Sequence, residues 1–438
     1  MRPILIKGGR VVDPSQGIDR TADVLLEDRL VAAVGPDLEA PGEARVIDAE
    51  GLVVCPGLID IHVHFRDPGE EYKEDIGSGA RAAAAGGFTA VATMANTDPV
   101  VDNTSGVRYV LDQAASACGV RVFPIGAVSQ GMGGKQLAEM GRMKRAGAVA
   151  FSDDGQPVVN GDLMRNALAY AGGLGSVVIV HEEDPHLVAN GVMHEGAISS
   201  VLGLRGVPPV AEEAMIARDI MLARITGARL HIAHLSTRDS VEMVRQAKAQ
   251  GVPVTAEVTA HHLLLTDRVV KDLNFDTDTR VNPPIRSEDH RLALWEGLLD
   301  GTIDAVASDH APHHPDDKDV EYDFAPAGIA GVEISLALLL DELARGTHGD
   351  LGLSTLIERM STGPARVLGL PGGTLRPDSP ADVTVIDLER KLTVDPENWQ
   401  SKSQNTPFKG RNLRGGPLFT IVGGRVVMEE GEIADHED

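Results

Sequence analysis

Two histidines stand two residues apart at the end of an apolar run, Leu58-Ile59-Asp60-Ile61-His62-Val63-His64. The run has the length and composition of a buried strand. Alternate residues of a strand point to the same face, so both imidazoles leave the strand end together, in a geometry that can chelate a metal ion. Arg66 follows two residues later and could hold an anion beside that metal.

Other strand-like runs also end in histidine or aspartate. Asp153-Asp154 ends the run at 148–153, and His181, His234 and Asp309 end the runs at 176–181, 229–235 and 302–308. Taken singly, a buried histidine is usually a core residue, and Asp-Asp-Gly is usually a turn. Together, four histidines and two aspartates at strand ends predict a metal site. These ligands suit Zn²⁺, with Mn²⁺ or Co²⁺ as substitutes.

Histidines elsewhere have other predicted roles. His261 and His262 follow a further strand-like run and are expected to support the ligands rather than to bind metal. His231 lies on the opposite strand face from His234 and is expected to be structural. Five more are expected at the surface or in loops: His186, His194, His290, His348 and His436.

Strand-like runs alternate with helical patterns between residues 55 and 372. There are eight such runs, at 58–64, 88–94, 120–128, 148–153, 176–181, 229–235, 253–259 and 302–308. Amphipathic stretches such as Lys135–Arg145 and Ser240–Gln250 predict helices between them. Eight β-then-α units predict a closed (β/α)8 barrel, an α/β fold that places chemistry at the C-terminal strand ends.

Both ends of the chain, residues 1–54 and 373–438, consist of short strand-like runs separated by Gly, Pro and Asp. Examples are Asp23–Leu26 and Asp382–Asp387, and Gly8-Gly9 indicates a turn. We predict that the two ends pair into one small β-sandwich domain, beside a catalytic barrel at 55–372.

Length, net charge and cysteine content limit the classes of protein to which this chain can belong. The 438 residues suffice for one large domain and a smaller one. The net charge of −25 should repel nucleic acid and anionic membranes, so an anionic substrate needs a local basic residue. Two isolated cysteines, Cys55 and Cys118, predict neither a disulfide framework nor a cysteine-rich zinc site. With no signal peptide and no membrane span in the pattern, we expect a cytoplasmic protein.

Six segments carry a resemblance to a known family. They are His62–Gly69, Met94–Thr97, Phe151–Gly155, Val281–Arg286, Ser308–His313 and Ser403–Phe408. On these segments the chain resembles the amidohydrolase superfamily, and within it the dihydroorotase family of the bacterial type I class. The segments span nearly the full length, so the resemblance is not confined to one motif.

The resemblance implies roles for the strand-end residues. His62, His64 and Asp309 would bind one zinc, and His181 and His234 would bind a second. A carboxylate should bridge the ions, and the resemblance points to Asp154. A shift of one residue in strand register would place Asp153 at the metal instead of Asp154, so the sequence leaves this choice open. The number of zinc ions also stays open, because one-zinc and two-zinc forms can share these ligands.

The resemblance also implies an activity, the reversible cyclisation of N-carbamoyl-L-aspartate to (S)-dihydroorotate and water in de novo pyrimidine (UMP) biosynthesis. A zinc-bound hydroxide would attack the ring amide, with Asp309 as the catalytic proton shuttle. The implied substrate-binding residues are His64, Arg66, Asn96, Asn282, His313, Ala327 and Gly328. From the residues alone, an Asx turn is favoured for Asn96, and an ion pair with Asp67 or Glu70 is the competing account for Arg66.

Two other functions stay open. One is another cyclic amidase, that is a hydantoinase, dihydropyrimidinase or allantoinase. The other is a non-catalytic scaffold for aspartate transcarbamoylase, which an active enzyme could also bind. We expect a small anionic substrate, a homo-oligomer, and no nucleic-acid or membrane partner. The acidic segment His314–Phe324 is a candidate lid or a solvated loop.

Overall fold

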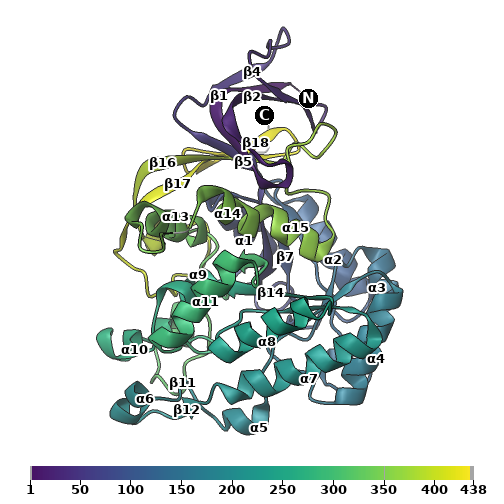
Figure 1. Ribbon diagram of the computed structural model, residues 1–438, viewed down its shortest axis with the longest axis vertical. Coiled ribbons are helices and arrows are strands. Elements are labelled where there is room, and N and C mark those ends of the chain that lie inside the picture. Colours follow the sequence, from purple (N-terminus) through teal and green to yellow (C-terminus); the bar gives the residue numbers. More distant parts are fainter. Residues whose placement is uncertain (1, 350, 435–438) are drawn as a thin grey trace.

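The computed structural model describes residues 2–349 and 351–434. It has two parts, drawn one above the other in Figure 1. A sheet built from both ends of the chain forms the upper part, and both termini lie beside it. Strands and helices from the middle of the chain form the lower part.

The lower part contains the eight parallel strands that the sequence predicts. They are β6 (Leu58–Val63), β7 (Phe88–Thr93), β8 (Arg121–Pro124), β9 (Phe151–Ser152), β10 (Val177–Val180), β13 (Arg229–Ile232), β14 (Val254–Thr259) and β15 (Ala305–Ala307). Three pair as β6-β7-β8 and five as β9-β10-β13-β14-β15. Parallel bridges Gly126–Phe151 and Val63–His310 join the two sets at both edges. The strands therefore close into a (β/α)8 barrel.

Burial on both faces explains why these strands are continuous apolar runs. Every residue of β6, β7 and β10 is buried. Parallel strands inside a ring of helices have no solvent face, so they lack the alternation of a half-exposed strand. A charged residue inside such a run, as at Asp60, must then find a partner in the interior.

Helices cover the outside of the barrel. α4, α7, α8 and α11 pack side by side in that order (Figure 1). The α-helices are α1 (Ile76–Ala85), α2 (Thr104–Ala115), α3 (Met140–Ala146), α4 (Gly161–Gly173), α5 (Pro185–Val188), α6 (Ala197–Leu202), α7 (Val210–Thr226), α8 (Arg238–Ala249), α9 (Ala260–Leu264), α10 (Arg268–Asp272), α11 (Glu288–Asp300), α12 (Pro315–Lys318), α13 (Ser335–Arg345), α14 (Leu353–Ile357) and α15 (Gly363–Leu368). Among the described residues, no helix combines the length and the apolar character needed to cross a membrane.

Shorter elements complete the connections. They are the 3₁₀ turns η1 (Pro14–Gln16), η2 (Gln130–Met132), η3 (Thr277–Thr279) and η5 (Pro396–Asn398), the π-helical turn η4 (Glu358–Thr362), and the strand pair β11 (Met193–His194) and β12 (Gly206–Val207). The helix predicted over Lys135–Arg145 was too long, because Leu137 forms a bridge with Ser129 and the helix starts only at Met140.

The sheet of the termini has nine strands within the described residues: β1 (Ile4–Asp13), β2 (Ile18–Glu27), β3 (Leu30–Gly35), β4 (Arg45–Asp48), β5 (Val53–Pro56), β16 (Val383–Thr393), β17 (Asn412–Val422), β18 (Arg425–Glu429) and β19 (Glu432–Ile433). β5 pairs with β1 on one side and β16 on the other, which joins the two ends of the chain. The turn predicted at Gly8-Gly9 was wrong: β1 continues through it, with an irregularity in its pairing to β2.

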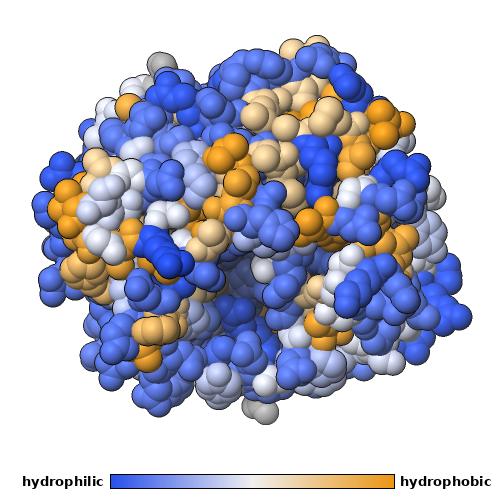
Figure 2. Space-filling model, turned by 90° about the horizontal axis from the view of Figure 1, so that it is seen from below, coloured by the Kyte–Doolittle hydropathy of each residue, from blue (hydrophilic) through white to orange (hydrophobic). Residues whose placement is uncertain are grey.

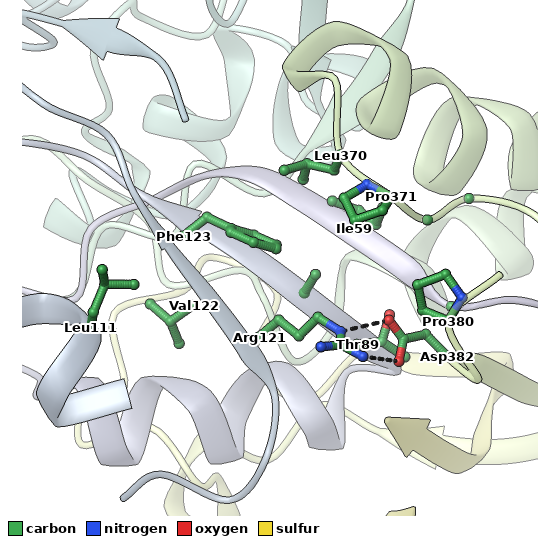
Figure 3. Close-up of a pocket in the computed structure, with 14 residues that line it drawn as sticks. Ile59, Thr89, Leu111, Arg121, Val122, Phe123, Leu370, Pro371, Pro380 and Asp382 are labelled. Atoms are coloured by element: carbon green, nitrogen blue, oxygen red, sulfur yellow. Dashed lines mark hydrogen bonds and ion pairs between the residues drawn. The ribbon is translucent and has the colours of Figure 1, made fainter. Parts of the chain in front are cut away.

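One ion pair ties the barrel to this sheet. Arg121 of β8 donates to Asp382, just before β16, through Nε at 2.8 Å and a second nitrogen at 3.0 Å. Asp382 also accepts the backbone N–H of Gly423 at 2.7 Å. The pair lies at one side of a mainly apolar cavity of about 260 Å³, with Phe123 and Leu370 on other walls (Figure 3).

We expect Asp382→Ala to destabilise the protein by about 1–3 kcal/mol, because the change leaves two donor groups at a half-buried site without their acceptor. The Asp382 side chain is only 10% exposed. A lower thermal unfolding temperature would report this loss. Glu389→Ala is the matched control, since Glu389 also pairs with an arginine, Arg414, but is 73% exposed. Equal shifts for the two variants would contradict the prediction.

Candidate metal and substrate site

The barrel brings the six predicted ligands together. His62 and His64 stand at the end of β6, Asp154 follows β9, and His181, His234 and Asp309 follow β10, β13 and β15. All six side chains are buried. The backbones of Arg66, His234 and Asp309 are left-handed, with φ of 60°, 30° and 46°. Such conformations are uncommon outside glycine and gather at functional sites.

Asp154 faces two pairs of histidines with its two oxygens. Its Oδ2 lies 3.5 Å from His62 Nε2 and 3.4 Å from His64 Nε2. Its Oδ1 lies 3.6 Å from both His181 Nδ1 and His234 Nε2. One carboxylate is thus shared by two groups of possible ligands, His62–His64–Asp154 and Asp154–His181–His234. This is the arrangement needed to bridge two cations.

Asp153 points elsewhere. Its Oδ1 accepts the backbone N–H groups of Val128 at 2.8 Å and Ser129 at 3.1 Å, and the Ser129 hydroxyl donates to its other oxygen. Asp153 therefore stabilises the 128–129 turn rather than the metal site. One residue of register accounts for the difference, which the sequence alone could not decide.

Glu257, in the middle of β14, holds two histidines and was missed in the sequence. Its Oε1 lies 2.6 Å from His62 Nδ1, and its Oε2 lies 3.1 Å from His231 Nε2. Burial opposes its ionisation, but the charge and hydrogen bonds of His62 and His231 lower the pKa of Glu257 to about 2. A carboxylate at His62 Nδ1 fixes the proton there and leaves the Nε2 lone pair for a cation. The sequence did contain one indication of this role, which is an acidic residue inside an otherwise apolar strand.

His64 is oriented in the same way by Asn96. The Asn96 Oδ1 lies 2.9 Å from His64 Nδ1, so the side chain contacts a candidate ligand instead of closing an Asx turn. Asp309 Oδ1 lies 3.1 Å from His64 Nε2 and 3.4 Å from His62 Nε2. Burial again opposes the charge, yet the neighbouring His62 and His64 hold the pKa of Asp309 well below its usual range.

Two atoms at the centre have no partner. Within the described part of the chain, His62 Nε2 and Asp154 Oδ1 are buried and make no hydrogen bond. Buried polar atoms are nearly always satisfied, so an unsatisfied nitrogen in one group of possible ligands and an unsatisfied carboxylate oxygen facing the other fit bound cations. The arrangement can therefore bind metal, and the hydrolase chemistry of a metal-activated water would follow.

A cavity of about 180 Å³ lies against these ligands. The predicted contacts Arg66, Asn96, Asn282, Ala327 and Gly328 line it together with His64, Asp154, His181, His234 and Asp309. Seen from below, this end of the molecule is hollowed near its centre, with hydrophilic surface in and below the hollow and apolar residues along parts of its upper rim (Figure 2).

Arg66 is available to an anion in this cavity. Its Nε donates to the Pro312 carbonyl at 3.2 Å. It forms no ion pair with any described residue, because Asp67 accepts from Tyr109 at 2.8 Å and Glu70 accepts from Lys73 at 2.5 Å. Both alternatives expected from sequence for Arg66 are therefore absent.

Two predicted contacts differ in detail. His313 does not line the cavity. Its Nε2 donates to the Ala327 carbonyl at 3.0 Å, from behind the cavity wall. Burial and the charges of Arg66 and Lys318 lower the pKa of His313 to about 2, so its ring is neutral. Asn282 lies 3.2 Å from His181 Nε2 through its amide nitrogen and also donates to Glu183.

The other histidines do not join the ligand groups. His262 contacts Thr259 at 2.8 Å and the Pro283 carbonyl at 2.9 Å, and His261 is buried beside it. His231 bonds Thr255 and Glu257, as a structural residue would. His194 was expected at the surface or in a loop, but it is buried against the His290 ring and lies in the short strand β11. His436 lies outside the described residues.

Comparison with known proteins places the chain in a family. A family model described as "Dihydro-orotase-like" matches residues 51–240. A dihydroorotase of Pelotomaculum thermopropionicum is 54% identical over 98% of this chain and 99% of its own length. A dihydroorotase of Geobacter metallireducens is 52% identical over 97% and 99%.

Solved structures share the architecture. The L-hydantoinase (dihydropyrimidinase) of Arthrobacter aurescens superposes with a TM-score of 0.88 at 30% identity, covering 99% of this chain and 98% of its own. The dihydropyrimidinase of Brevibacillus agri, at 24% identity and a TM-score of 0.85 over 99% and 96%, shares the fold. With relatives this similar over nearly its full length, the chain belongs to the dihydroorotase family, whose members are cyclic amide hydrolases of the amidohydrolase superfamily.

Proposed function

We propose that this chain interconverts N-carbamoyl-L-aspartate and (S)-dihydroorotate, with water released on ring closure, in de novo pyrimidine biosynthesis. One observation carries the proposal. A carboxylate shared by two histidine pairs lies under a cavity whose wall holds an arginine without an ion pair. The first feature suits amide hydrolysis, and the second suits a small substrate with a carboxylate.

We propose zinc as the metal, in one or two copies. His62, His64 and Asp309 would hold one ion, His181 and His234 the other, and Asp154 would bridge them. Imidazole nitrogens and carboxylate oxygens in sets of three or four are the usual zinc ligands. When bound, zinc would lower the pKa of a water toward neutrality and polarise the amide carbonyl.

Asp309 is the proposed proton shuttle. Its lowered pKa keeps the carboxylate ionised, so it can accept the proton of the attacking water. The water oxygen bonds to the ring amide carbon, the carbon–nitrogen bond breaks, and Asp309 returns the proton to the leaving nitrogen. Ring closure runs through the same steps in reverse.

Arg66 is the proposed anchor for the substrate carboxylate, which a guanidinium can bind with two parallel hydrogen bonds. The likeness to an L-hydantoinase favours a second candidate, another cyclic amidase. Hydantoin and dihydrouracil carry no carboxylate, so such a substrate would leave Arg66 without a partner. A purely scaffolding role is disfavoured because every candidate ligand is present.

The decisive experiment is an assay of the purified protein with dihydroorotate, hydantoin, dihydrouracil and allantoin. We expect dihydroorotate to be preferred, activity to be lost with a chelator and regained with Zn²⁺, and elemental analysis to give the zinc content. Zinc-loaded protein that leaves both dihydroorotate and N-carbamoyl-L-aspartate unchanged would overturn the proposal. Gel filtration with added aspartate transcarbamoylase tests that partnership and reports the oligomeric state.

We expect Arg66→Gln to raise KM for dihydroorotate by about 10- to 100-fold, which corresponds to the loss of a charge-assisted hydrogen-bond pair. The metal content should stay as in the parent protein, since Arg66 contacts no ligand side chain. Steady-state kinetics and elemental analysis measure both effects. An unchanged KM would remove Arg66 from the anion site.

Asp309→Asn should lower kcat by about 10²- to 10⁴-fold, because an amide cannot accept the proton of water. Elemental analysis must accompany the assay, since Asp309 is also a candidate ligand. A variant that retains its metal and loses turnover supports the shuttle role. A metal-loaded variant with nearly normal kcat would assign the proton transfer to another group.

A further inference from the structure

Lys318, at the end of α12, is the one basic residue of the acidic segment 314–324. Its side chain is 6% exposed. Nζ donates to three backbone carbonyls, of Pro326 at 2.8 Å, Gly328 at 3.0 Å and Thr277 at 3.1 Å. An ammonium has three N–H donors and a neutral amine has two, so three acceptors favour the charged form, against the burial that lowers the pKa of Lys318 to about 8. This segment is thus anchored at its centre.

One of the residues that Lys318 holds, Gly328, lies in the wall of the substrate cavity, and a second, Pro326, comes directly before the wall residue Ala327. Ala327 and Gly328 line the cavity, and their carbonyls accept from side chains that do not line it. His313 donates to the Ala327 carbonyl, and Asn405 donates to the Gly328 carbonyl at 2.9 Å. The backbone of the wall is closely packed at Gly328, because a Cβ at this position would lie 2.7 Å from the Ala311 carbonyl oxygen.

Lys318 also brings positive charge to this wall. Its Nζ forms no ion pair with any carboxylate among the described residues; its three bonds go to neutral carbonyls. Arg66 and Lys318 both act on the buried ring of His313 and disfavour its protonation. Two cations therefore lie behind and beside the same stretch of cavity wall, in a protein whose net charge is −25. A carboxylate entering here gains from both.

We propose that Lys318 is a positioning and selectivity residue for the substrate carboxylate. It fixes the 326–328 wall against which the substrate lies and adds a second positive charge to that of Arg66. This inference rests on the proposed function. It assigns to Lys318 a share of the preference for an acidic ring over a neutral one, without contact with the reacting atoms.

The test compares Lys318→Met with the parent protein on two ligands that differ only in the carboxylate. KM for dihydroorotate is measured beside the inhibition constant of dihydrouracil. We expect KM to rise about tenfold, the inhibition constant to change less than twofold, and the metal content to stay the same. Equal losses for both ligands would reduce Lys318 to a structural anchor, and unchanged values for both would remove it from the site.

Two further variants keep the test decisive. Lys248→Met is the matched control: Lys248 is a partly buried lysine that donates to Asp304 at 2.7 Å and to the Gly301 carbonyl at 3.2 Å, on the outside of the barrel. Lys248→Met should lower the unfolding temperature without changing KM.

If Lys318→Met does not fold, Lys318→Arg is measured in its place. A retained preference for dihydroorotate supports the charge role of Lys318, and an equal loss for both ligands overturns that role. A parent protein inactive on dihydroorotate would contradict the proposed function itself, and calorimetric binding of the two ligands would still test Lys318.

Discussion

The central constraint is one buried carboxylate shared by two pairs of histidines. Asp154 lies between imidazole nitrogens on both of its oxygens, at 3.4–3.6 Å, and Asp309 and Glu257 lie close by. Three carboxylates in a space that excludes water repel one another and lose their hydration. Positive charge placed among them would stabilise such a group. The unpartnered His62 Nε2 and Asp154 Oδ1 are atoms to which a metal ion could bind.

The barrel supplies the rigidity that this group requires. Glu257 lies inside β14 and holds His62, while Asp60 lies inside β6 and accepts the backbone N–H groups of His62 at 3.1 Å and Ser308 at 3.2 Å. Burial raises the pKa of Asp60 to about 7. Acids within buried strands are unfavourable by themselves, so their presence is explained by the orientation they give to the loops that carry the ligands.

Much of this arrangement could be predicted from the chain itself. Apolar runs that end in histidine or aspartate mark parallel strands, and the barrel geometry then gathers their ends. The roles of residues that act through a partner distant in the sequence could not be predicted. Glu257 acts through His62, 195 positions away. Asp153 and Asp154 differ only by strand register, and His313 bonds the backbone of the wall residue Ala327 and does not itself line the cavity.

Local patterns failed where pairing overrides propensity. Lys135–Glu139 has a helical pattern, but the bridge from Leu137 to Ser129 holds it extended. Gly8-Gly9 has the composition of a turn, yet β1 runs on because β2, β4 and β5 all pair with it. His194 lies off the strand ends, yet it is buried against the His290 ring and beside Arg286. In each case a contact with residues outside the segment decided its conformation or its burial.

In the proposed function, the candidate metal ligands and the cations proposed to select the substrate lie on different parts of the fold around one cavity. The candidate metal ligands leave the strand ends, whose spacing is fixed by the closed sheet, and a hydantoinase shares that framework at 30% identity. Arg66, Lys318 and the 326–328 wall lie on the loops that follow β6 and β15, which can change without moving the ligands. A net charge of −25 repels an acidic substrate, so the local field of these cations must reverse the global one. Substrate choice within this fold can therefore be altered by a few loop cations, while the hydrolytic framework of the barrel stays intact.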